Sequence, residues 1–176
     1  RFEEALALYD EFVAADPDAA PAHLLRGHTL KTVGRVEEAV EAYRSVYRAR
    51  PDFGDAFWSL ANLKTYHFEG AEIDHMREHQ QSDATSLDDR IHLSFALGKA
   101  MEDAKDYAAS ADYYLLGNEL KNKETHYDKE RMTYKLALQQ KFCTAELFQN
   151  FADAGCVAPD PIFIVGLPRA GSTLLE

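Results

Sequence analysis

The chain has 176 residues, of which 46% are hydrophobic and 28% charged, and its formal net charge is −11. This acidic balance disfavours nucleic acids and anionic membranes as partners, because both require a basic protein surface. Cys143 and Cys156 do not form a Cys-x-x-Cys pair, which excludes a disulfide framework or a zinc ribbon and favours the cytoplasm. No apolar run approaches the roughly 20 residues that span a bilayer.

A repeat with a period of about 34 residues is the strongest pattern at the start of the chain. An alanine, a tyrosine and a proline recur at one constant spacing, as Ala5 and Ala39, Tyr9 and Tyr43, and Pro17 and Pro51. With Gly27 and Gly34, the pattern resembles the tetratricopeptide repeat (TPR), in which each repeat is a helical hairpin. The resemblance predicts a complete repeat over residues 20–53, preceded by a partial one. We therefore expect the natural N-terminus to lie upstream of Arg1.

Two looser repeats are predicted next. The third begins its first helix at residues 56–61 and has a shorter second helix at 71–80. After a polar loop, Ser86 and Asp89 stand at capping-box spacing before a helix over 90–103. The helix that follows places Ser110 and Tyr114 where the repeat has its alanine and its aromatic residue.

The predicted fold class is all-α, a solenoid of about four TPR hairpins over residues 1–141, of which the first is partial. An amphipathic helix is expected at 128–141 and a short one at 144–151. Residues 142–160 then form a short helix and linker, and residues 161–176 are predicted to start a second domain.

A stack of TPR hairpins exposes a concave face built by the first helix of each repeat. The TPR resemblance predicts that eight residues face this groove: Leu24, His28, Lys31 and Thr32 in the second repeat, and Trp58, Asn62, Thr65 and Tyr66 in the third. Core packing is an equal alternative for Trp58, because large aromatic side chains are usually mostly buried. We expect a peptide, or a catalytic domain of the same protein, to bind here.

The composition changes near the end of the chain. Residues 162–165 form a short β-branched run suited to a buried parallel strand, and a loop between Gly166 and Gly171 follows before a helix begins. Backbone amides at such a helix start bind phosphate. Arg169 can add a charged contact, and Ser172 and Thr173 add hydroxyl donors. An NTPase is disfavoured, because Ser172 stands where a Walker A loop has lysine.

Residues 161–174, which read PIFIVGLPRAGSTL, resemble the 5′-phosphosulfate-binding loop of sulfotransferases. The closest branch is the protein-tyrosine sulfotransferases and bacterial proteins that join TPR arrays to such a domain. The resemblance implies that 3′-phosphoadenosine 5′-phosphosulfate (PAPS) is the co-substrate and that Arg169, Ala170, Gly171, Ser172 and Thr173 hold its 5′-phosphate. Ala170 departs from the usual serine and removes one hydroxyl contact. The catalytic residues of the family lie beyond Glu176, so none is expected in this segment.

A zinc hydrolase is the rival enzyme hypothesis. His75, Glu78 and His79 have the spacing of an inverted zincin motif. The surrounding residues are charged and the motif falls in a predicted repeat helix, so we expect no metal. The alternative to a sulfotransferase is a TPR protein–protein interaction module with a non-catalytic tail.

Overall fold

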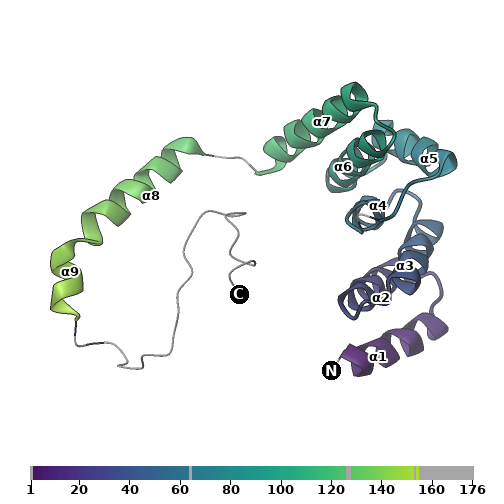
Figure 1. Ribbon diagram of the computed structural model, residues 1–176, viewed down its shortest axis with the longest axis horizontal. Helices are drawn as coiled ribbons and strands as arrows, with labels where there is room; N and C mark the ends of the chain where they lie inside the picture. Colours follow the sequence, from purple (N-terminus) through teal and green to yellow (C-terminus); the bar gives the residue numbers. More distant parts are fainter. Residues whose placement is uncertain (1, 64, 126–127, 153, 155–176) are drawn as a thin grey trace. The chain divides into compact units, whose positions relative to one another are not determined.

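The computed structural model describes residues 2–63, 65–125, 128–152 and 154. Nine α-helices and no strand occupy these described residues (Figure 1). The helices are α1 (Phe2–Ala15), α2 (Ala20–Thr32), α3 (Val36–Ala49), α4 (Gly54–Ala61), α5 (Gly70–Gln81), α6 (Leu87–Asp103), α7 (Tyr107–Thr125), α8 (Lys129–Phe142) and α9 (Ala145–Asn150). None of them is both long and apolar enough to cross a membrane. The predicted strand and phosphate-binding loop lie outside the described residues.

The chain divides into two compact units, residues 1–127 and residues 128–176. In the second unit, the side chain of Asp128 caps α8 and that of Thr144 caps α9. Helices are therefore present at both predicted positions, but the predicted amphipathic character of the first of them is not confirmed, because α8 has no buried residue. The end of the repeat array at residue 141 stays a prediction.

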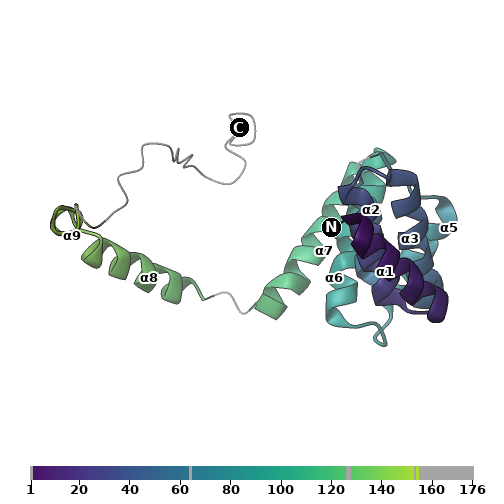
Figure 2. The same cartoon turned by 90° about the horizontal axis from the view of Figure 1, so that it is seen from below.

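The helices of residues 1–127 stack in chain order from α1 to α7 (Figure 1). The first helices α2, α4 and α6 lie along one side, and the second helices α3 and α5 lie along the other. Figure 2 views this stack from the α1 end, with α1 in front of α2 and α3. This arrangement is consistent with the predicted solenoid of helical hairpins, in which α1 is the second helix of the partial first repeat.

A glycine sets the distance between the two paired helices in the second repeat, and another does so in the fourth repeat. A Cβ atom added at Gly27 of α2 would lie 2.5 Å from the ring of Tyr43 on α3. One added at Gly98 of α6 would lie 2.8 Å from the ring of Tyr114 on α7. Carbon atoms in ordinary contact are about 3.5–4 Å apart, so these approaches require glycine. In both hairpins a glycine of the first helix therefore contacts an aromatic ring of the second helix.

The third repeat departs from the pattern. Its first helix, α4, has 8 residues, whereas α2 has 13. Residues 62–69 then connect α4 to α5, and within them Tyr66 and Phe68 pack edge to face with ring centroids 5.1 Å apart. Phe68 also packs against the hydrophobic cluster that contains Phe57 and Met76. The connector therefore supplies part of the core between α4 and α5.

A buried aspartate joins the third and fourth repeats. Asp89, in the first turn of α6, is 4% exposed. One of its carboxylate oxygens accepts a hydrogen bond from the amide of Gly54, at the start of α4, at 2.9 Å. The other pairs with the guanidinium of Arg50 and accepts from the Ser86 hydroxyl at 2.7 Å. Ser86 also caps α6 by accepting from the Asp89 amide, which confirms the predicted cap.

Candidate interaction face

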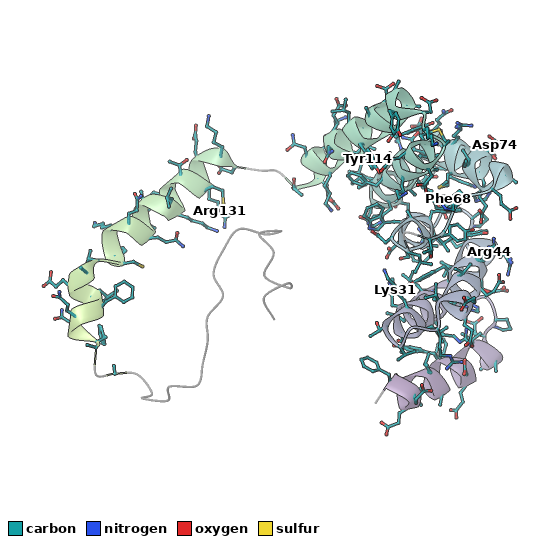
Figure 3. All side chains as sticks on the ribbon, in the orientation of Figure 1. Lys31, Arg44, Phe68, Asp74, Tyr114 and Arg131 are labelled. Carbon is teal, nitrogen blue, oxygen red and sulfur yellow. The ribbon has the colours of Figure 1, made fainter. Side chains whose placement is uncertain are left out.

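The helices α2, α4 and α6 lie along one side of the stack, and we call the surface they form there the first-helix face. On α6, the half-buried residues of this face recur at helical spacing, so they lie along one stripe. In Figure 3, Lys31 on α2 and Arg44 on α3 lie on opposite sides of the stack. The first-helix face is formed by His28 and Lys31 of α2, Trp58 and Asn62 of α4 and its C-cap, and His92, Phe95, Lys99 and Asp103 of α6.

The predicted groove residues on α2 differ in exposure. Leu24 is 9% exposed and belongs to the hydrophobic cluster of α2, α3 and α4. It lies in the core rather than on the predicted groove, because its helix face is turned towards α3. His28 is half-buried, and its Nδ1 atom lies 3.0 Å from the hydroxyl of Tyr43. Lys31 and Thr32 are exposed, and the Thr32 hydroxyl donates to the carbonyl of His28 at 2.8 Å.

The hydroxyl of Tyr43 is held in the interior by its contact with His28. Burial raises the pKa of Tyr43 to about 12, with a smaller contribution from the negative charge of Asp55. The neutral phenol is therefore the stable form beneath His28. It fixes the orientation of the imidazole on the first-helix face.

Trp58 and Phe95 form an aromatic pair at the middle of the first-helix face. Both side chains are half-buried, and their ring centroids lie 5.6 Å apart with the rings tilted by 50°. Trp58 also packs against the cluster around Phe57 and Leu93. It thus satisfies both interpretations that the sequence left open. One side of the indole belongs to the core and part of it stays accessible.

Polar groups flank the aromatic pair. Asn62 is exposed and donates from Nδ2 to the carbonyl of Trp58 at 3.0 Å. On α6, Lys99 forms an ion pair with Asp103, and the two side chains are 23% and 18% exposed. Hydrogen-bond donors and acceptors therefore stand beside a partly exposed apolar surface. This combination is typical of sites that bind a peptide segment.

Tyr66 lies on the opposite side of the stack, against the second helices. Its hydroxyl donates to Glu72 of α5 at 2.5 Å and accepts from Arg44 of α3 at 3.3 Å. Burial, followed by donation to the Glu72 carboxylate, raises the pKa of Tyr66 above its ordinary value. The predicted placement on the groove fails because α4 ends at Ala61. The same early end leaves Thr65 in the connector rather than on a first helix.

One constant repeat period does not predict Phe95 and Lys99 as residues of this face. They follow Trp58 and Asn62 at an interval slightly longer than the spacing of the first two repeats. The interval is longer because α6 begins one turn further ahead of its small residue: Gly98 is the twelfth residue of α6, whereas Ala61 is the eighth residue of α4. The small residue of the repeat indicates their positions, because Gly98 follows Ala61 at the same longer interval.

The zincin-like motif is placed in α5, where His75 has a structural contact. Its Nε2 atom donates to the carbonyl of Pro51 at 2.7 Å, and its ring lies 4.6 Å from that of His79. No group of three His, Cys, Asp or Glu side chains able to hold a metal ion occurs among the described residues. The predicted phosphate-binding residues, Arg169, Ala170, Gly171, Ser172 and Thr173, lie outside them.

Comparison with known proteins supports the repeats at the start of the chain. Residues 1–52 and 24–63 match the tetratricopeptide repeat family. The chain is 27% identical over 149 residues to an uncharacterized protein of Aquifex aeolicus (strain VF5). That similarity covers 85% of this chain and 19% of the relative, so the chain spans about a fifth of the relative's length. TPR repeats typically serve protein–protein interaction, and the fold and the matched residues agree on this class.

Proposed function

We propose that this chain is an interaction region whose first-helix face binds a peptide segment of another protein domain. The observation that carries this proposal is the half-buried pair of Trp58 and Phe95. Aromatic side chains contribute large contact areas, and partly exposed ones at the centre of a polar rim are the residues on which binding energy concentrates. Asn62, Lys99 and His28 supply the rim.

The geometry favours a partner with an apolar or aromatic side chain. Such a side chain would pack against Trp58 and Phe95, while its backbone amides and carbonyls meet Asn62 and the pair of Lys99 and Asp103. Preformed hydrogen bonds fix Asn62 and His28 before binding, which lowers the entropy that binding must remove.

The test uses a random peptide library displayed against the 176-residue chain. The chain has one tryptophan, so the emission of Trp58 reports directly on ligands of this face. We expect selected peptides to shift this emission and to lose at least about tenfold in affinity when Asn62 is changed to Arg, a substitution at an exposed C-cap. Tyr107→Ala, at a 65% exposed tyrosine of α7, is the matched control. Equal affinity for the wild type and for Asn62→Arg would refute this use of the face.

We also propose that the longer protein is a sulfotransferase that transfers a sulfuryl group from PAPS to an acceptor hydroxyl. The support is the loop sequence at residues 161–174 together with the preceding repeats. In this proposal the first-helix face presents the acceptor to the catalytic domain. The two cysteines and their spacing support a cytoplasmic location.

The sulfotransferase proposal is tested on a longer polypeptide that extends about 200 residues past Glu176, an ordinary domain length. We expect it to bind adenosine 3′,5′-bisphosphate and to lose at least about tenfold in affinity on Arg169→Ala, because a charge-assisted contact to phosphate is removed. Lys141→Ala, at an exposed lysine of α8, serves as the control. Unchanged affinity after Arg169→Ala would count against the assignment.

A further inference from the structure

Two buried polar atoms on the first-helix face have no hydrogen-bond partner. They are Nδ1 of His92 and Oδ2 of Asp103, and no other buried side-chain nitrogen or oxygen in the described part of the chain lacks one. Both residues lie on the stripe of α6 that also carries Phe95 and Lys99. Buried polar groups of folded proteins nearly always have a partner. Two exceptions on the same interaction face therefore favour a ligand that supplies the missing contacts.

The carboxylate of Asp103 is satisfied on one side only. Its Oδ1 atom accepts from the ammonium group of Lys99, one turn earlier on α6. Its Oδ2 atom lies 3.5 Å from Nδ1 of His67, without a hydrogen bond between them. The His67 side chain is 71% exposed and belongs to the connector of residues 62–69, so an incoming group can displace it. Because an ionised carboxylate only accepts hydrogen bonds, the missing partner of Oδ2 is a donor.

The surrounding charge favours a cationic donor. The chain has a net charge of −11, and a surface of one sign selects a partner of the other. Asp103 is the last residue of α6, where the negative end of the helix dipole adds to its own charge. A guanidinium group suits this half-buried carboxylate better than an ammonium group, because it is more weakly hydrated and presents several N–H donors in one plane.

We propose that the segment bound by the first-helix face is basic, and that an arginine of this segment donates to Oδ2 of Asp103 while an apolar side chain packs against Trp58 and Phe95. This inference rests on the proposed use of the face. Asp103 follows Phe95 by about two helical turns, roughly 12 Å along α6. An extended segment covers that distance in about three or four residues, which sets the spacing between its apolar anchor and its arginine. About one turn to the other side of Phe95, a polar group of the segment meets Nδ1 of His92.

The test begins with the peptides that the displayed library yields against the 176-residue chain and that shift the emission of its one tryptophan. We expect these peptides to share an arginine, or less often a lysine, about three or four residues from an aromatic or apolar residue. One selected peptide is then synthesised in two forms, with its arginine and with glutamine in its place. The wild-type chain should bind the glutamine form at least about tenfold more weakly. Asp103→Asn should bind the two forms with similar affinity.

Asp112→Asn is the matched control, because it removes the same charge at an exposed residue of α7. It should keep the wild-type preference for the arginine form, which would exclude the overall charge of the chain as the cause. The comparison of the two peptide forms on the wild-type chain needs no change to the protein. A folding defect of Asp103→Asn therefore cannot conceal the result.

Selected peptides without a basic residue, or an enrichment of acidic peptides, would overturn the proposal. An equal preference for the arginine form in the wild type and in Asp103→Asn would do the same. Peptides that still shift the emission of Trp58 and lose affinity on Asn62→Arg would, in either case, leave the proposed function standing. A library that yields no ligand of the first-helix face would count against both.

Discussion

Replacement of Asp89 by alanine tests whether one buried carboxylate holds the third and fourth repeats together. Asp89 accepts a hydrogen bond from the Gly54 amide at 2.9 Å and pairs with Arg50. It also accepts from Ser86 at 2.7 Å. The substitution removes all three interactions at once and leaves the backbone of α6 unchanged.

The loss in free energy of unfolding depends on which former partners of Asp89 can bind water once its carboxylate is removed. The side chain of Arg50 is 45% exposed, so its guanidinium is rehydrated, and the exposed Ser86 also finds water. The amide of Gly54 is buried and keeps no partner, which costs about 1–3 kcal/mol. The lost charge-assisted hydrogen bond to Asp89 adds to this. We expect Asp89→Ala to lower the free energy of unfolding by about 2–4 kcal/mol.

Urea unfolding followed by Trp58 fluorescence measures this effect, because Trp58 lies on α4, the helix that begins at Gly54. Asp88→Ala is the matched control. Asp88 precedes Asp89 in the same first turn but is exposed, so its loss removes only a helix-dipole interaction of about 0.3–1 kcal/mol.

A destabilisation by Asp89→Ala no greater than that by Asp88→Ala would refute this reasoning. It would mean that the buried ion pair and its hydrogen bonds contribute no net stability at the junction. Asp89→Asn gives an intermediate case, because the amide oxygen can still accept from Gly54 while the charge facing Arg50 is lost.

Three further results are expected in unfolding experiments. Gly27→Ala should lower the free energy of unfolding by about 1–3 kcal/mol, because the added methyl group clashes with Tyr43. Gly70→Ala should leave that free energy unchanged, because an added Cβ there meets nothing within 4 Å. Equal effects of the two substitutions would contradict the packing. Lys105→Gly should stabilise the chain by about 1 kcal/mol, because Lys105 has a φ of 62° at the turn position that Gly34 occupies with a φ of 82°; a loss of stability would contradict this. Burial raises the pKa of Tyr43 to about 12, so its contribution is complete below its unfolded pKa of about 10 and is lost as pH rises towards 12. Urea midpoints across that range should fall less in Tyr43→Phe than in the wild type, and an unchanged slope would contradict the assignment.

The regular part of the array was predictable because its side chains repeat with its backbone. Ala39, Tyr43 and Gly27 are buried where the pattern placed them, since close helix packing tolerates few residue types at those positions. Ser86 also marked the start of α6 correctly, because a capping side chain acts on amides within its own turn.

The third repeat could not be predicted in the same way. Residues 62–69 contain no proline to end the helix, yet α4 stops at Ala61. Tyr66 finds Glu72 and Arg44 in space, and Phe68 finds the cluster around Phe57. These contacts join residues that are distant in the sequence, and they decide the conformation over local preference. Tyr66 therefore lies against the second helices instead of on the first-helix face.

The central claim is that partners bind the first-helix face. Hydrogen exchange of the 176-residue chain, with and without a peptide selected from the displayed library, tests it most directly. We expect new protection in α4 and α6, together with a shift in the emission of Trp58. Protection confined to α3 and α5, with the emission of Trp58 unchanged, would contradict the claim.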